Sequence, residues 1–323
     1  MPVRVNASSI RCFSNSRYFV PLPAGHVFPM RKFPDSVSKL IDEGTLSTDD
    51  LIDPGSIDDV DLLRVHTPDY VRSIRTGTYN DLTARRLGLP WSERLCLRSH
   101  AAVAGTLLAA EAALEDGIAC NLAGGTHHAY PDRGEGFCVF NDVAVAIRAL
   151  QHEEPYIHAM VVDLDAHQGN GTNFIFTGDA NVFTYSMHVG RNYPSRKETG
   201  SLDVELPRWV GGHEYLMRLH STLPHAIERF EPDVVFYIAG VDVHEGDRFG
   251  QMMLTTDQMR ERDEWTIDLC RDWDVPIAVL YGGGYNKAEG MTTELHCQTV
   301  RVAAARFRAE RAERSSLNPR TVS

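Results

Sequence analysis

The stretch Val161–Thr172, "VVDLDAHQGNGT", starts as an apolar, strand-like run and continues into three ionisable residues and two glycines. Its Asp163, Asp165 and His167 occupy alternate positions, and alternate side chains of a β-strand point to the same face. Burying two carboxylates and an imidazole is costly unless they are paired or bind a metal ion. The stretch therefore predicts a buried strand that ends in a functional site, with the three ionisable groups on one face.

Short apolar runs alternate with helical segments on both sides of this stretch, which is typical of a parallel sheet covered by helices on both faces. No linker divides the chain, so we expect residues 1–323 to form one α/β domain with a frayed tail from about residue 307 to 323. The predicted strands are 118–122, 157–165, 181–189, 233–242 and 276–285. The predicted helices are 36–44, 65–77, 100–115, 143–151, 214–230, 255–273 and 294–314.

The composition restricts the class of protein. With 43% apolar and 24% charged residues, the 323-residue chain can bury a large core, which excludes disorder of the whole chain. The formal net charge of −12 argues against nucleic acid as a main partner, because phosphate binding needs clustered lysines and arginines. It leaves room for a cationic substrate.

The cysteines and the apolar runs indicate the compartment. The 6 cysteines lie far apart and form no CxxC pair, which argues against a cysteine-based zinc site and favours buried, reduced thiols. The N-terminal "MPVRVNASSIRCF" lacks the apolar segment of a signal peptide, and no run approaches membrane-spanning length. We expect a cytoplasmic protein that does not bind a membrane.

Polar or ionisable residues follow each of the predicted strands, and sites in open parallel sheets form outside the carboxyl ends of the strands. One such residue alone is usually a helix cap or a turn residue, so it is their common position that indicates a site. The segments concerned are Gly124–His128, Asp163–His167, Ser186–His188, Asp242–Asp247 and Gly282–Asn286.

These residue types suit metal-assisted hydrolysis. Asp165, His167 and Asp242 could supply the three protein ligands of a catalytic Zn²⁺, whose charge the two carboxylates would balance. Asp163 could then support the ligands from behind or bind a monovalent cation. The pair His127 and His128 could exchange protons with the attacking water and the leaving group. The phenol of Tyr285 could donate a hydrogen bond to a developing oxyanion. Together with the metal, these residues predict hydrolysis of an acyl bond, most simply an amide.

Five segments resemble the histone deacetylase family, which has the arginase–deacetylase fold. They are "GGTHHA", "GFCVFND", "VVDLDAHQGNGT", "AGVDVHEGDRFG" and "YGGGYN", in the family's order, and the resemblance covers about residues 15 to 305. The forms "AHQGN", "EGDRFG" and "GHVFPMRKF" are most similar to the class IV and bacterial deacetylase-like branch. The resemblance implies a zinc-dependent hydrolase that removes acetyl or longer acyl groups from the side-chain amine of lysine in proteins or peptides.

The resemblance also implies roles for single residues: Asp165, His167 and Asp242 as zinc ligands, His128 as the general base beside His127, and Tyr285 polarising the carbonyl. It further implies an inner potassium site at Asp163, Ser186 and the backbone of Asp165, His167 and Met187, and an acyl-lysine channel lined by Gly136, Phe137, Tyr193, Phe249 and Gly283.

Two positions need separate interpretation. Asn170 stands where class I members place an acid behind the second histidine, so we expect a lower pKa for His128 than in class I. His244 follows the ligand position Asp242 by two residues, and we expect a packed or rim histidine rather than a ligand.

Three alternatives remain. A binuclear manganese ureohydrolase of the arginase type would need a further acid after His167 and a DxD pair in place of "DVHEGD", but Gln168-Gly169-Asn170 and Val243 occupy those places. A catalytically silent binding module would not need the complete residue set. An acetylpolyamine or another acylated small amine is the alternative substrate, although the chain lacks the long insertion common in polyamine enzymes. The acyl chain length and the oligomeric state stay open.

Overall fold

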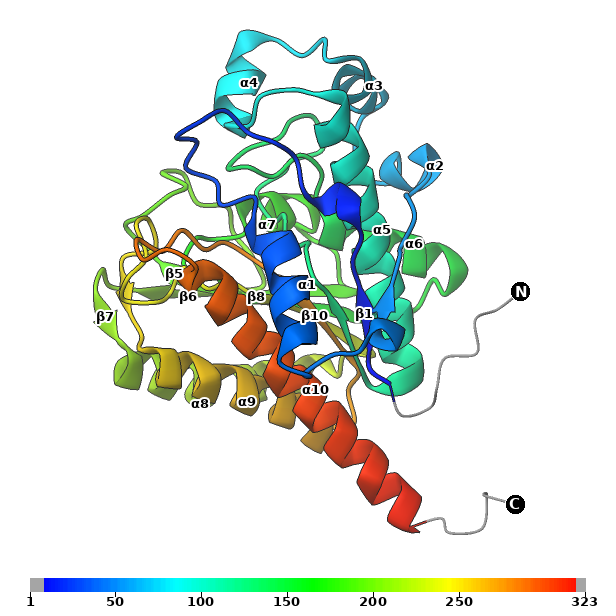
Figure 1. Ribbon diagram of the computed structural model, residues 1–323, viewed down its shortest axis with the longest axis vertical. Helices are drawn as coiled ribbons and strands as arrows, with labels where there is room; N and C mark the ends of the chain where they lie inside the picture. The colour runs from blue at the N-terminus through cyan, green and yellow to red at the C-terminus, as the bar shows by residue number, and fades with distance from the viewer. Residues whose placement is uncertain (1–8, 318–323) are drawn as a thin grey trace.

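An eight-stranded sheet forms the centre of the molecule, which a computed structural model describes from residue 9 to residue 317 (Figure 1). All pairings between its neighbouring strands are parallel, as the sequence predicted. In sheet order the strands are β2 (Leu51–Ile52), β1 (Arg11–Phe13), β3 (Ile118–Asn121), β10 (Ile277–Tyr281), β8 (Val234–Ala239), β4 (Ala159–Asp163), β5 (Val182–Val189) and β6 (Leu202–Leu206). A separate parallel pair consists of β7 (Val210–Gly211) and β9 (Met252–Met253).

Helices cover both faces of the sheet. The face with Met160 and Val162 packs against α1, α8, α9 and α10, and the face with Ala159 and Val161 packs against α5 and α6. In Figure 1, α1 and α10 lie side by side in front of the sheet. The helices are α1 (Lys32–Asp42), α2 (Asp59–Leu62), α3 (Pro68–Thr76), α4 (Asp81–Leu87), α5 (Glu93–Asp116), α6 (Asp142–Glu153), α7 (Asn170–Ile175), α8 (Gly212–Phe230), α9 (Thr256–Asp272) and α10 (Met291–Leu317), with short 3₁₀ turns η1 (Ser16–Tyr18) and η2 (Thr48–Asp50).

The strand β4 corrects one expectation. It ends at Asp163, so Asp165 and His167 lie in the loop that follows it rather than on the strand itself. The last backbone bond to β8 is donated by Leu164 to Ile238, after which the chain leaves the sheet. Strand alternation therefore determines the side-chain direction of Asp163 alone, and the conformation of the loop determines the directions of Asp165 and His167.

Several element ends also differ from the prediction. The helix expected from residue 100 starts at Glu93, because Ser92 caps it by accepting a hydrogen bond from the Leu95 amide. The helix α10 continues to Leu317, so residues 307–317 are helical rather than a frayed tail; the remainder of that expected tail, 318–323, lies outside the described residues.

Two expectations from composition can be compared with the structure. All six cysteines are free, and all except Cys96 are buried. Within residues 9–317, no helix combines the length and the apolar character that crossing a membrane requires.

Candidate active site

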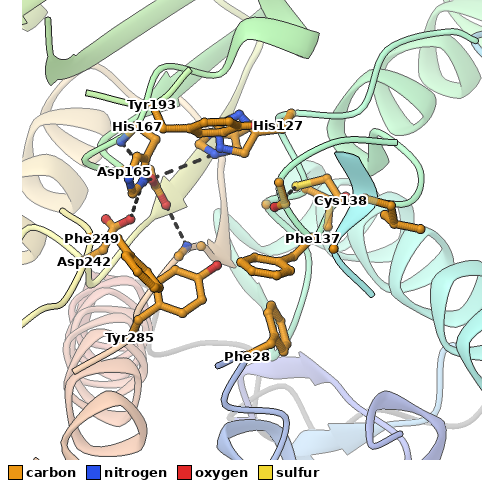
Figure 2. A pocket seen from close by; sticks show the side chains of 18 of the residues that line it. Phe28, His127, Phe137, Cys138, Asp165, His167, Tyr193, Asp242, Phe249 and Tyr285 are labelled. Atoms are coloured by element: carbon orange, nitrogen blue, oxygen red, sulfur yellow. Dashed lines mark hydrogen bonds and ion pairs between the residues drawn. The ribbon is translucent and has the colours of Figure 1, made fainter. Parts of the chain in front are cut away.

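Three potential metal ligands meet at the carboxyl ends of the adjacent strands β4 and β8. Asp165 and His167 follow β4, Asp242 follows β8, and their ligand atoms all lie within 4.8 Å of one another. Nδ1 of His167 lies 2.8 Å from Oδ2 of Asp242 and 3.2 Å from Oδ1 of Asp165 (Figure 2). The structure therefore brings together the three residues that the sequence predicted as ligands.

Backbone amides hold both carboxylates in place. Oδ1 of Asp242 accepts a hydrogen bond of 2.8 Å from the Ala166 amide, and Oδ2 of Asp165 accepts one of 2.6 Å from the Gly283 amide. A Cβ atom at Gly283 would lie 2.5 Å from Oδ2 of Asp242, so only glycine lets the β10 loop approach this closely. Each carboxylate keeps its other oxygen directed at His167.

The charges of the cluster favour a positive charge among its three side chains. Burial alone would lower the pKa of His167, but its hydrogen bonds to Asp165 and Asp242 raise that pKa to about 10. A proton on this ring thus lies between two buried carboxylates. Two carboxylates and one imidazole also form a donor set of the kind that binds a divalent cation such as Zn²⁺, with the proton displaced from the ring.

The tandem histidines have different partners. Nδ1 of His127 lies 2.6 Å from Oδ2 of Asp163, whereas Nδ1 of His128 lies 2.6 Å from Oδ1 of Asn170. Both rings are buried, with their centroids 4.1 Å apart. One histidine is therefore paired with a carboxylate and the other with a neutral amide.

This difference separates the charges of the two rings. For His127, burial lowers the pKa, but the carboxylates of Asp163 and Asp165 raise it to about 9. For His128, burial and the neighbouring rings of His127 and His167 hold the pKa well below its usual value. The surroundings thus favour a proton on the ring of His127 and disfavour one on the ring of His128.

The amide of Asn170 determines which nitrogen of His128 is free. Its Nδ2 donates to the hydroxyl of Tyr130 over 3.1 Å and to Glu135 over 3.4 Å, which directs its oxygen to His128. That oxygen accepts the proton of Nδ1, so Nε2 is the unprotonated nitrogen of the neutral ring. This is the tautomer that a general base at the cavity needs.

The cluster lies in a cavity of about 430 Å³, and aromatic side chains form its walls (Figure 2). The ring of Tyr285 packs against Phe249 at 5.1 Å, Phe137 at 5.7 Å and Phe28 at 6.2 Å between centroids. Burial and the nearby carboxylates hold the pKa of Tyr285 well above its usual value, so its hydroxyl remains a donor. All five expected channel residues, Gly136, Phe137, Tyr193, Phe249 and Gly283, line this cavity.

The cavity wall beside His128 requires a glycine at position 136. Gly136 has φ +54, and a Cβ atom there would lie 2.5 Å from Cδ2 of His128. The next residue, Phe137, also has a positive φ, of 67, which side chains other than glycine rarely adopt. The strained turn places the Phe137 ring in the cavity while leaving room for His128.

Comparison with known proteins identifies the family of the chain. Residues 26–300 match the family described as histone deacetylase domain. The chain belongs to the histone deacetylase family. It is 30% identical over 304 residues to "Histone deacetylase 2" of Arabidopsis thaliana, covering 88% of this chain and 76% of that protein. It is 28% identical over 284 residues to "Acetoin utilization protein AcuC" of Staphylococcus aureus, covering 81% of this chain and 73% of that protein.

A bacterial relative and solved structures extend the comparison. An uncharacterized protein of Picosynechococcus is 43% identical over 270 residues, or 84% of this chain and 90% of that protein. The crystal structure of the HDA15 HD domain has a TM-score of 0.75 at 22% identity and covers 94% of this chain and 93% of that one. A structure titled as a histone deacetylase homolog complexed with SAHA also has a TM-score of 0.75 at 22% identity, covering 93% and 84%. These structures show that this family member has the deacetylase fold.

Three residues expected at the inner cation site, Asp163, Ser186 and Met187, do not line the cavity, whereas Asp165 and His167, whose backbone was also expected there, do. Asp163 and Ser186 are partners across β4 and β5. The Ser186 hydroxyl lies 2.9 Å from Nδ1 of His188, while Asp163 contacts His127. The side chain of Met187 is fully buried in the core.

His244 is occupied by neighbouring groups and is not in the cluster of ligand atoms. Its Nδ1 accepts hydrogen bonds from the Gly246 amide over 3.0 Å and from Nδ2 of Asn286 over 2.9 Å. Its Nε2 lies 3.3 Å from Oγ1 of Thr256. These contacts agree with the expectation of a packed histidine that joins two loops.

Several residues that line the cavity were not indicated by the sequence. Phe28 forms part of its aromatic wall, and the cations Lys32 and Arg98 line it although both are buried. Nζ of Lys32 donates to the Gly282 carbonyl over 2.8 Å, and burial lowers the pKa of this amine to about 8. Phe28 and Lys32 belong to "GHVFPMRKF", which indicated the branch of the family but carried no chemical pattern of its own.

Proposed function

We propose that this protein is a zinc-dependent hydrolase that removes acyl groups from the side-chain amine of lysine in peptides or proteins. The observation that carries the proposal is the cluster Asp165, His167 and Asp242 at the floor of an aromatic cavity, beside one neutral and one charged histidine. The family supports deacetylase chemistry. Bound at the cluster, Zn²⁺ would lower the pKa of water and polarise the amide carbonyl.

The chain's own residues have separate roles in this proposal. His128 takes a proton from the attacking water at its free Nε2, because Asn170 holds the Nδ1 proton. His127 is charged and paired with Asp163, which stabilises positive charge beside the reacting centre. The protonated hydroxyl of Tyr285 donates to the oxygen of the amide as negative charge develops on it.

The aromatic walls suit a neutral, extended acyl-lysine chain. Phe137, Phe249 and Phe28 surround Tyr285 and offer apolar contacts to methylene groups. The walls also exclude water from the floor of the cavity, which strengthens the hydrogen bond from Tyr285. An acylated small amine is the second candidate substrate, since the same walls would accept its aliphatic chain.

Further proposals concern cofactor and location. A potassium ion at Asp163, Ser186 and Met187 is proposed from the resemblance, and the hydroxyl and carboxylate oxygens there are suitable ligands for a hard cation. We also propose a cytoplasmic location, in keeping with six free cysteines.

The experiment is a substrate profile. The zinc-loaded protein is incubated with acetyl-, octanoyl- and myristoyl-lysine peptides of one sequence and with acetylspermidine, and release of free amine is measured. We expect turnover of at least one acyl-lysine peptide with a higher kcat/KM than that of acetylspermidine. A strong preference for acetylspermidine would show that the lysine assignment is wrong.

A further inference from the structure

Arginines surround the mouth of the cavity, although the chain as a whole carries a net charge of −12. Arg85 and Arg86 from the last turn of α4, and Arg248 from the loop after β8, line it. The acidic side chains among the described residues that line the same cavity are Asp165 and Asp242, at its floor. The mouth is therefore positive, opposite in sign to the whole chain.

Backbone hydrogen bonds fix these arginines to the walls of the channel. The carbonyls of Arg86 and Leu87 accept hydrogen bonds of 3.0 and 2.9 Å from the amides of Gly136 and Phe137. The Arg248 amide donates to the Tyr285 carbonyl over 3.3 Å. The backbone of Arg86 and Arg248 is thus joined directly to the cavity walls, and both side chains line the cavity beside Tyr285.

Two of the three guanidinium groups are available to a ligand. Arg85 and Arg248 are exposed, and neither forms an ion pair with another side chain within residues 9–317. Arg86 lies 3.9 Å from Glu135, which also lies 3.8 Å from Arg133, so Arg86 is partly neutralised. Exposed arginines without acidic partners next to an active site favour the approach of anionic ligands.

We infer that the acylated lysine enters this site from an acidic peptide, whose flanking carboxylates contact Arg85 and Arg248 while the neutral acyl-lysine chain occupies the cavity. The inference rests on the proposed function and names the substrate class of the same site. Guanidinium groups bind carboxylates through paired hydrogen bonds, and they repel a polyamine, which carries several positive charges. The mouth therefore disfavours the polyamine substrate that the acidic composition alone would allow.

The test compares three acyl-lysine peptides that differ only in the residues flanking the modified lysine: glutamate, glutamine or lysine. We expect kcat/KM for the glutamate peptide to exceed that for the lysine peptide by about 10-fold or more at low ionic strength. The ratio should fall as salt is added, because salt screens exposed charges. Equal values, or a preference for the lysine peptide, would overturn the inference.

Charge-reversed variants locate the effect. Arg85→Glu and Arg248→Glu should each reduce the glutamate preference several-fold, whereas Arg218→Glu, an exposed residue of α8 that does not line the cavity, should retain it. A preference that persists in both mouth variants would overturn the inference. Hydrolysis of the glutamine peptide without a glutamate preference contradicts the inference alone, and hydrolysis of none of the peptides contradicts the proposed function as well.

Discussion

Asn170 is the residue that distinguishes the two histidines of this site. Its amide oxygen accepts the Nδ1 proton of His128 over 2.6 Å, while Tyr130 and Glu135 hold the amide nitrogen. A neutral acceptor fixes the tautomer but offers little stabilisation to a second proton on the ring. His128 therefore stays a free base to lower pH than a carboxylate-supported histidine would.

Replacing Asn170 by aspartate should raise the pKa of His128. A carboxylate this close favours the charged ring, and opposite charges at such distances shift pKa values by about 1–3 units. His128 has to be unprotonated to act as a base, so the acid limb of the kcat/KM profile of Asn170→Asp should move to higher pH by about that amount. A profile identical to that of the wild type would remove His128 from the role of base.

For single residues, the sequence indicated the polar groups of the active site better than the residues that form the cavity walls. The ligands and histidines occur in short motifs at strand ends, where a polar residue next to an apolar run is conspicuous. Phe28 comes from an N-terminal loop and Lys32 from the start of α1, and nothing in their local sequence indicates that the fold brings them to the cavity. Their positions depend on packing between distant segments, which one sequence does not encode in a readable pattern.

Among the strands of the large sheet, β3, β4, β5, β8 and β10 were predicted, whereas β1 and the edge strands β2 and β6 were missed. The strands β8 and β10 are continuous apolar runs, β4 is apolar up to its last residue, Asp163, and every residue of the three strands is buried. The edge strand β6 has the sequence "LDVEL" and is mostly half-buried. Its polar residues interrupt the apolar run, so the sequence did not indicate a strand there. The edge strand β2 has only two residues, too few to give a periodic pattern.

The helix α5 provides a prediction at this scale, because its Gly105 lies against β3. A Cβ atom there would meet the hydroxyl of Tyr18 and lie 2.7 Å from Oδ1 of Asn121, and this hydroxyl donates a buried hydrogen bond to that oxygen. Alanine is favoured over glycine inside a helix by about 1 kcal/mol, but overpacking a core costs about 1–3 kcal/mol. Gly105→Ala should thus lower the free energy of unfolding in denaturant titrations, and an increase would contradict this packing.

For the molecule as a whole, His66 joins three distant segments. The carbonyl of Tyr130 lies 3.1 Å from its Nδ1, and its Nε2 accepts a hydrogen bond of 3.0 Å from the Asn141 amide at the start of α6. Protonating Nε2 would place an N–H against that amide. Burial accordingly lowers the pKa of His66 from 6.5 to about 4.

This depressed pKa predicts how stability depends on pH. Above pH 6.5 the ring is neutral in both the folded and the unfolded state; as the pH falls towards 4, the unfolded state binds the proton first and stability is lost. The loss is on the order of 3 kcal/mol, from about 1.4 kcal/mol per pKa unit. His66→Gln cannot titrate here, so the stability difference between wild type and variant should narrow from pH 7 to pH 4. A constant difference in unfolding titrations would show that His66 is not the titrating group.

The most direct test of the whole account is a zinc titration of the metal-free protein, with hydrolysis of an acyl-lysine peptide as the measured rate. We expect activity to rise linearly and to stop at one zinc per chain, and Tyr285→Phe to bind the same amount of zinc but to turn over about 10²–10³-fold more slowly. A requirement for two metal ions per chain, or undiminished turnover in Tyr285→Phe, would contradict it.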